Sequence, residues 1–141
     1  MQQIKDIMTR DVAVAQLDDT LQSAAQTMQR LNIGALPVCE GSALAGMLTD
    51  RDITVRGVAA GLNPGSALVR DVMSSDVLSC QADDTVEQVM AAMGSAQVRR
   101  LAVLDADRRI VGIVALGDLA IRQTRHTDAT LRDISAPAPL L

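Results

Sequence analysis

The chain has 141 residues, of which 48% are hydrophobic and none is Phe, Tyr or Trp, and its formal net charge is -4 at pH 7. An acidic chain without aromatic side chains has neither a basic surface for a phosphate backbone nor a stacking platform for bases, which excludes nucleic acid as a main ligand. We expect one compact domain or two mutually dependent halves with an aliphatic core.

The N-terminal residues, MQQIKDIMTR, lack the apolar segment of a signal peptide. No stretch of the chain approaches the roughly 18 continuous apolar residues that can span a bilayer. The sequence therefore predicts a cytoplasmic protein without a membrane segment.

The first predicted helix follows an Asp-Asp-Thr start signal at residues 18–20. Its core-facing stripe at helical spacing comprises Leu21, Ala24, Ala25, Met28 and Leu31. Two short strands follow, ALPV and ALAGMLT, and then a helical stretch at 53–60. The breaker GLNPG at 61–65 closes this half of the chain.

The second half repeats the first at a shift of about 65 residues. Asp-Asp-Thr recurs at 83–85, and GMLTDRDI, after one inserted residue, lies over GIVALGDL. The second helix stripe comprises Val86, Val89, Met90 and Met93. The strands RLAVL and RIVGIVAL and a helical stretch at 118–124 complete the repeat. We therefore predict an α/β (α+β) fold of two β-α-β-β-α repeats with pseudo-twofold symmetry.

The predicted boundaries are 1–61 for the first repeat, 62–68 for the linker, 69–124 for the second repeat and 125–141 for the C-terminal tail. In the tail, HTDATLRDISAPAPLL predicts a short helical turn and then an extended end, and the sequence predicts no function for it. Cys39, Cys80 and the single histidine, His126, fit no metal spacing, so no metal site is predicted. The two cysteines are expected to be small buried residues, although a disulfide stays an alternative.

Thr49 and Asp52 allow two interpretations. A Thr followed three residues later by an acid is a capping-box pattern, which would make both residues local helix caps. Alternatively, Asp52 accepts hydrogen bonds from a ribose diol while Thr49 faces a phosphate. The second repeat keeps the acid, as Asp118, but has Ala115 in place of the threonine, so capping alone explains Asp52 better than Asp118.

The motifs DIMTRDV, IGALPV and GMLTDRDI, repeated as DVMSSDV, VRRLAV and GIVALGDL, resemble a tandem pair of CBS domains, or Bateman module, over roughly residues 4–124. The segments NIGALP and GVAAGLNP are similar to the stand-alone bacterial pairs of the hypoxic response protein type. The resemblance implies a non-enzymatic regulatory module that forms a homodimer and requires no cofactor. It also implies clefts that hold adenine nucleotides such as AMP, ADP or ATP, and signalling through an effector protein.

The resemblance implies two ligand sites. The residues implied for the first are Thr49, Arg51 and Asp52, with Ser74, Leu78 and Val98 from the other repeat closing over the base. The residues implied for the second are Asp118, Thr9, Ala13, Ile33 and Gly34, with Arg99 and Arg100 reaching phosphates. Each site departs from the full pattern, because Ala115 has no hydroxyl and the first repeat has Gly34 and Ala35 where the second has its arginines.

Two other functional classes stay open at this point. A ligand-independent dimeric interaction module would keep the fold without the nucleotide, as Ala115 permits. An enzyme is disfavoured because the sequence has no catalytic triad, P-loop or metal cluster and only one histidine. The identity of the nucleotide, of the effector and of the signal is not encoded in any recognisable motif.

Overall fold

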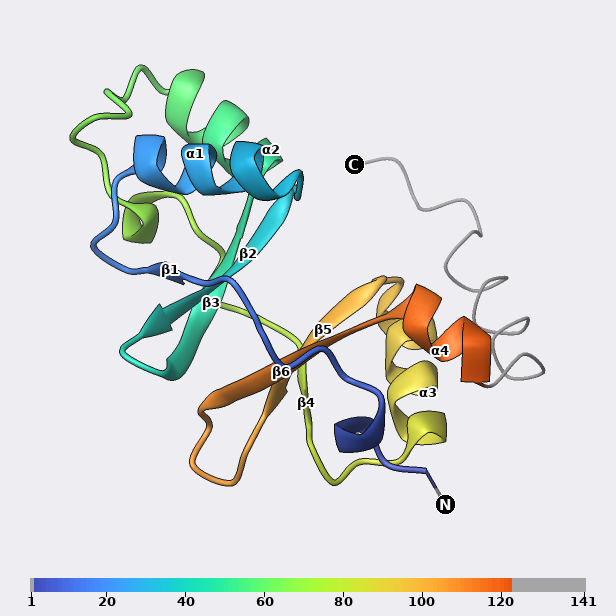
Figure 1. Ribbon diagram of the computed structural model, residues 1–141. Helices are drawn as coiled ribbons and strands as arrows, with labels where there is room; N and C mark the ends of the chain where they lie inside the picture. Colours follow the sequence, from blue (N-terminus) through green and yellow to red (C-terminus); the bar gives the residue numbers. More distant parts are fainter. Residues whose placement is uncertain (1, 123–141) are drawn as a thin grey trace. The chain divides into compact units, whose positions relative to one another are not determined.

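The computed structural model describes residues 2–122, which form two compact units (Figure 1). Within the described residues, unit 1 combines residues 2–12 with residues 78–122, and unit 2 is Ala13–Val77. The units are therefore offset from the sequence repeats. Residues 2–12 belong to the unit built mainly from the second repeat, and residues 69–77 belong to the unit built mainly from the first.

Unit 2 has a three-stranded sheet in the order β1-β2-β3. Its elements are β1 (Ala15–Gln16), α1 (Leu21–Leu31), β2 (Ala35–Glu40), β3 (Ala43–Thr49), α2 (Asp50–Asp52), the π-helical segment η2 (Ile53–Val58) and the 3-10 turn η3 (Val69–Asp71). The central strand β2 is parallel to β1 and antiparallel to β3. The segment η2 contacts α1, and in Figure 1 both lie on the same side of the sheet.

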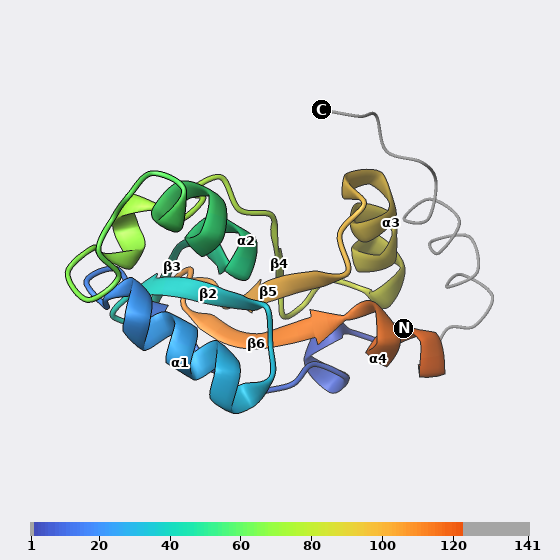
Figure 2. The same cartoon turned by 90° about the horizontal axis from the view of Figure 1, so that it is seen from above.

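Unit 1 has the same topology, with the strand order β4-β5-β6. Its elements are the 3-10 turn η1 (Ile4–Asp6), β4 (Ser79–Gln81), α3 (Val86–Ala96), β5 (Arg100–Leu104), β6 (Ile110–Ala115) and α4 (Leu116–Arg122). The helices α3 and α4 contact each other. Figure 2 shows both at the same end of the sheet of unit 1. The predicted β-α-β-β-α fold is thus confirmed in both units.

The Asp-Asp-Thr signals do start the helices, as predicted. The side-chain oxygens of Thr20 and Thr85 accept hydrogen bonds from the N–H three residues further on, at 3.1 and 3.2 Å. Both helices end at a residue with a φ of 55°, Asn32 and Gln97. A left-handed residue at this position lets the chain leave the helix while its last carbonyls stay bonded.

The predicted stripe of α1 is wider than the face that the core covers. Leu21, Ala24 and Met28 are buried, whereas Ala25 is exposed and Leu31 is 44% exposed. At about 100° per residue, Ala25 and Leu31 lie at opposite edges of the stripe. Their assignment to the core was wrong because periodicity gives the direction of a face but not its width. The stripe of α3 is buried throughout, as predicted.

The helical stretch after β3 starts earlier than predicted, at Asp50 instead of residue 53. Thr49 is its N-cap, so the turn before residue 53 is already helical. The helix then widens into η2, where the N–H of Ala59 donates to the carbonyl of Thr54 five residues earlier. The last helix begins at Leu116 rather than 118, and residues 123 and 124 of the predicted stretch, like the tail, lie outside the described residues.

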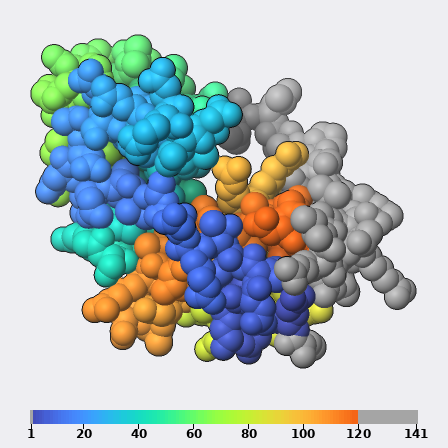
Figure 3. All heavy atoms as spheres, viewed as in Figure 1, coloured from blue at the N-terminus to red at the C-terminus, as the bar shows by residue number. Residues whose placement is uncertain are grey.

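The two 3-10 turns anchor the segments that are exchanged between the repeats. Ile4 of η1 is fully buried in the core of unit 1, and Val69 of η3 is fully buried in the core of unit 2. Figure 3 shows the dark blue N-terminal residues beside the orange residues of unit 1. Each core is therefore incomplete without a short segment from the other repeat.

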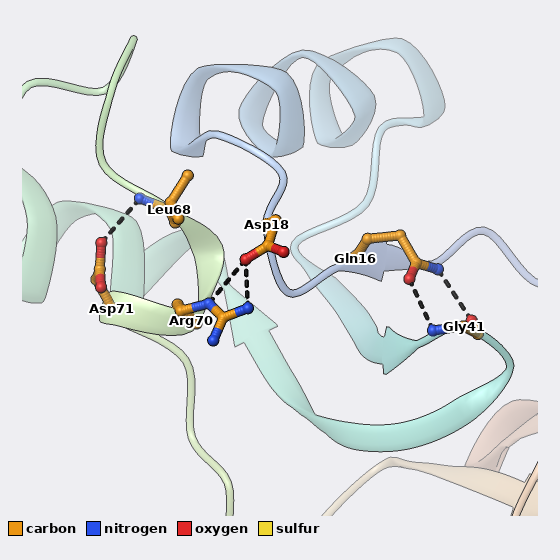
Figure 4. A network of polar contacts seen from close by, with 6 residues as sticks. All are labelled: Gln16, Asp18, Gly41, Leu68, Arg70 and Asp71. Carbon is orange, nitrogen blue, oxygen red and sulfur yellow. Dashed lines mark hydrogen bonds and ion pairs between the residues drawn. The ribbon is translucent and has the colours of Figure 1, made fainter.

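On the surface, polar contacts also hold each 3-10 turn to its own unit. In unit 2, Arg70 forms an ion pair with Asp18, and the Asp71 carboxylate accepts a hydrogen bond from the N–H of Leu68 at 2.9 Å (Figure 4). In unit 1, Lys5 forms the corresponding ion pair with Asp83, at 3.1 Å. Each 3-10 turn is thereby tied to the Asp-Asp-Thr loop of its own unit.

Candidate functional site

The junction between β3 and α2 holds Thr49 and Asp52 in a complete capping box. The Thr49 Oγ1 accepts from the N–H of Asp52 at 3.0 Å, and the Asp52 Oδ2 accepts from the N–H of Thr49 at 3.0 Å. A cap of this kind stabilises a helix by about 1 kcal/mol. The interpretation of Thr49 and Asp52 as local helix caps is therefore correct, and it leaves the ribose-binding interpretation of Asp52 untested.

The matching junction between β6 and α4 keeps half of this arrangement. The Asp118 Oδ2 accepts from the N–H of Ala115 at 3.3 Å, although Ala115 has no hydroxyl to complete the box. Asp118 is thus a capping residue as well, which the sequence pattern without a threonine did not indicate. Both aspartates are half-buried and stand at the same place in their units.

Each junction is bonded to the segment that precedes the central strand. In unit 2 the N–H of Asp50 donates to the carbonyl of Gly34 at 2.9 Å, and in unit 1 the N–H of Leu116 donates to the carbonyl of Arg99 at 2.8 Å. The geometry brings the predicted residue Gly34 next to the Thr49–Asp52 turn. It likewise brings Arg99 next to the turn that carries Asp118.

Ser74 and Thr9 lie along the last strand of their units. Ser74 exchanges two backbone hydrogen bonds with Met47, at 2.9 and 3.0 Å, and Thr9 exchanges two with Ile113, both at 2.9 Å. A glycine makes this approach feasible in unit 2, since a Cβ on Gly46 would lie 2.5 Å from the carbonyl oxygen of Ser74. The glycine that opens each repeated motif therefore has a packing role.

The other predicted residues have simpler surroundings. Ala13 and Ile33 pack against the core of unit 2, and Val98 packs against that of unit 1. Leu78 is 44% exposed. The three predicted arginines, Arg51, Arg99 and Arg100, are exposed and so are available to a ligand.

Taken by unit, the predicted site residues divide into two groups. Unit 2 contains Ala13, Ile33, Gly34, Thr49, Arg51, Asp52 and Ser74. Unit 1 contains Thr9, Leu78, Val98, Arg99, Arg100 and Asp118. Each predicted ligand site combines residues of both groups, and these combinations stay predictions.

One residue near the candidate site was missed by the sequence reasoning. A Cβ on Gly34 would lie 3.1 Å from Oδ2 of Asp50, so the Asp50 carboxylate stands directly beside the glycine. The signal was available only through the strand register, which pairs Ala35 with Thr49 and so brings Gly34 close to Asp50.

Capping by an aspartate is common in this fold. Backbone N–H groups three residues earlier also donate to Asp6, Asp19, Asp71 and Asp84, at 2.8–3.1 Å. The cap contacts of Asp52 and Asp118 are therefore no mark of a ligand site in themselves. These other aspartates provide matched controls for any experiment on Asp52 and Asp118.

The two cysteines are free and buried, as expected. Burial raises the pKa of the Cys39 thiol. Burial, with a smaller effect from the Asp84 carboxylate, raises the pKa of Cys80 to about 12. Both thiols are therefore protonated at neutral pH and lack the thiolate that redox or nucleophilic chemistry requires.

A metal centre would need several suitable ligands close together. Within residues 2–122, no group of three or more His, Cys, Asp and Glu side chains could hold a metal ion. His126 lies outside the described residues. In the same part of the chain, no helix has the length and hydrophobicity required to cross a membrane.

The chain matches a family of known proteins over most of its length. The model of the CBS domain matches twice, at residues 4–56 and 69–123. The CBS domain-containing protein YhcV of Bacillus subtilis (strain 168) is 43% identical over 129 residues, which are 92% of this chain and 91% of that protein. Hypoxic response protein 1 of Mycobacterium tuberculosis is 38% identical over 123 residues, which are 86% of this chain and 85% of that protein.

Two solved structures are similar over most of the chain. The crystal structure of Hypoxic Response Protein I with two coordinated zinc ions has a TM-score of 0.77 at 38% identity and covers 86% of this chain and 98% of its own. The CBS domain pair of protein MJ0100, in complex with 5′-methylthioadenosine and S-adenosyl-L-methionine, has a TM-score of 0.71 at 26% identity. It covers 86% of this chain and 94% of its own.

Proposed function

Because this chain belongs to the CBS domain family, we propose that it is a non-enzymatic regulatory module that binds adenine nucleotides and signals through a partner protein. The observation that carries the proposal is the matched pair Asp52 and Asp118, which occupy the same half-buried position after the last strand of each unit. The ligands proposed are AMP, ADP and ATP. The cytoplasmic location predicted from the sequence stays a prediction.

The chemistry of the residues suits an adenosine ligand. A carboxylate can accept hydrogen bonds from both hydroxyls of a ribose. The cap uses Oδ2 of Asp52 and of Asp118, which leaves Oδ1 of each outside the cap. The exposed guanidinium groups of Arg99 and Arg100 suit phosphate oxygens. The binding of 5′-methylthioadenosine and S-adenosyl-L-methionine by the similar MJ0100 pair supports an adenosine compound here.

The ligand-binding proposal is tested with Asp52→Ala and Asp118→Ala in titration calorimetry of nucleotide-stripped protein. A hydrogen bond to a charged group contributes about 1.5–3 kcal/mol, so each variant should raise the Kd of the ligand bound there at least about tenfold. The controls are Asp71→Ala in unit 2 and Asp6→Ala in unit 1, which also remove a capping carboxylate. An equal loss of binding in the controls would show that damage to a cap, and not ribose contact, explains the effect.

Dimerisation is the second part of the proposal. Four large apolar side chains of unit 2 are exposed on or near α1 and η2: Leu31 at 44%, Val55 at 48%, Val58 at 65% and Leu62 at 37%. An apolar group of this kind favours contact with another protein surface. We assign it to the homodimer that the resemblance to CBS pairs implies.

The dimer is tested by Val58→Glu, which places a charge on this apolar surface. Sedimentation equilibrium should show a dimer for the wild-type protein and a monomer for the variant. The control is Thr54→Glu, one turn earlier and also exposed, which should disturb association less because it removes no apolar contact. A wild-type monomer at micromolar concentration would contradict the proposal.

A ligand-independent interaction module is the second candidate function. The absence of a hydroxyl at Ala115 and the capping role of both aspartates favour it. It predicts a stable dimer that is indifferent to nucleotides and whose partner binding survives Asp52→Ala and Asp118→Ala. Capture of a partner only in the presence of nucleotide would count against this candidate.

A further inference from the structure

The two matched junctions differ in charge at the positions that their backbones bring together. In unit 2 the bonded pair is Gly34 and Asp50, whereas in unit 1 it is Arg99 and Leu116. The same backbone hydrogen bond, 2.9 Å in one unit and 2.8 Å in the other, fixes both pairs. Gly34 and Asp50 in unit 2 are therefore structurally equivalent to Arg99 and Leu116 in unit 1.

We define two half-sites from these positions. The Asp52 half-site is Gly34, Ala35, Asp50, Arg51 and Asp52. The Asp118 half-site is Arg99, Arg100, Leu116, Gly117 and Asp118. The first contains two carboxylates and one arginine, and the second contains two arginines and one carboxylate.

The Asp50 carboxylate is held in place at the Asp52 half-site. Its Oδ1 accepts from the N–H of Arg51 at 2.8 Å, and its Oδ2 lies 3.1 Å from where a Cβ on Gly34 would be. The glycine thus leaves room for the carboxylate in the place where unit 1 has an arginine. In unit 1 the residue matched to Asp50 is Leu116, which is buried and uncharged.

We propose that the Asp52 half-site selects adenosine compounds without a phosphate, neutral or cationic, and that the Asp118 half-site takes phosphorylated adenine nucleotides. Asp50 is the residue that determines this specificity. The inference rests on the proposed function, since it requires that Asp52 and Asp118 each bind a ribose.

Electrostatics gives the reason for the selection. Asp50 and Asp52 belong to the same helical turn, so a phosphate on a ribose held by Asp52 would lie within the range of charge interactions, about 8 Å at physiological ionic strength. Repulsion by Asp50 then weakens the binding of a nucleotide but not of a neutral nucleoside. Arg99 and Arg100 have the opposite effect at the Asp118 half-site.

The test compares AMP with 5′-methylthioadenosine, which share adenosine and differ in having a phosphate or a neutral thioether at the 5′ position. In Asp118→Asn protein, where the Asp52 half-site is intact, we expect methylthioadenosine to bind about tenfold more tightly than AMP. Adding Asp50→Asn should remove most of this difference, because asparagine keeps an oxygen for the N–H of Arg51 but carries no charge. In Asp52→Asn protein, AMP should instead bind more tightly than methylthioadenosine. Adding Arg99→Gln should reduce this preference for AMP.

A salt titration gives a second measurement that needs no further variant. Raising the salt concentration on Asp118→Asn protein should lessen the discrimination against AMP, since screening weakens the repulsion. Equal affinity for the two ligands in this protein, or a preference that neither Asp50→Asn nor salt alters, would overturn this inference but leave the proposed function intact. If the wild-type protein bound neither compound, the proposed function would fail and the inference with it.

Discussion

A single carboxylate can serve the fold and a ligand at the same time. Asp52 gives Oδ2 to the N–H of Thr49, and the Thr49 Oγ1 accepts from the N–H of Asp52. The cap leaves Oδ1 of the aspartate outside it, and it uses the threonine oxygen only as an acceptor, so the hydroxyl hydrogen can still be donated. The capping and ribose-binding interpretations of this pair are therefore compatible.

The glycines of the repeated motif have a clear structural requirement. A Cβ on Gly46 would lie 2.5 Å from the carbonyl oxygen of Ser74, and one on Gly112 would lie 2.9 Å from that of Thr9. In both cases a backbone oxygen, which cannot rotate away as a side chain can, is among the obstructing atoms, although at Gly112 the nearest atom is the Met8 Sδ at 2.5 Å. The resemblance to CBS pairs implies Ser74 and Thr9 as site residues, so these glycines would also set the position of candidate ligand contacts.

We predict that Gly46→Ala lowers the free energy of unfolding by about 1–3 kcal/mol, the usual effect of forcing extra volume into a packed place. Denaturant unfolding measures it. Gly117→Ala is the control, because a Cβ there would meet nothing within 4 Å and alanine favours a helix by up to about 1 kcal/mol. Equal stability of the two variants would contradict the packing role of Gly46.

At the scale of elements, the exchanged 3-10 turns make the two sequence repeats interdependent. Ile4 of η1 is fully buried in the core of unit 1, and Val69 of η3 is fully buried in the core of unit 2. Around them the ion pairs of Lys5 and Arg70 are solvent-exposed, so most of the anchoring comes from apolar burial. Neither repeat, cut at its sequence boundary, would keep its whole core.

The interdependence predicts a large effect from a residue near the N-terminus. Ile4→Ala should lower the free energy of unfolding by about 2–5 kcal/mol, as expected for truncation of a fully buried aliphatic side chain. Lys5→Ala, which removes only an exposed ion pair, should change it by less than about 1 kcal/mol. Similar values for the two variants in denaturant unfolding would refute the anchoring role of η1.

The sequence predicted the helices and strands well. It did not predict that η1 and η3 each pack into the core built mainly from the other repeat. The Asp-Asp-Thr signals and the period of the apolar residues identified both long helices, because these signals are local. The exchange of η1 and η3 could not be predicted, since the two repeats are alike and Ile4 would fit either core by pattern alone. Asp50 was missed for a related reason, because its proximity to Gly34 depends on strand register.

At the scale of the whole molecule, one fold occurs twice with different chemistry. Both units have the same topology and the same aspartate, but only unit 2 has the Thr49 hydroxyl, and only unit 1 has an arginine pair. Such divergence within a tandem CBS pair would let one chain respond to two ligands of different charge. Either ligand would change the binding of a partner protein only if it binds two conformational states of the module with different affinities.

The most direct test of the central claim is isothermal titration of nucleotide-stripped wild-type protein with AMP, ADP, ATP, NAD and S-adenosylmethionine. We predict micromolar affinity for at least one of these compounds. Affinities no better than millimolar across the whole panel, for a protein shown by circular dichroism to be folded, would contradict the claim and leave the dimeric interaction module as the better account.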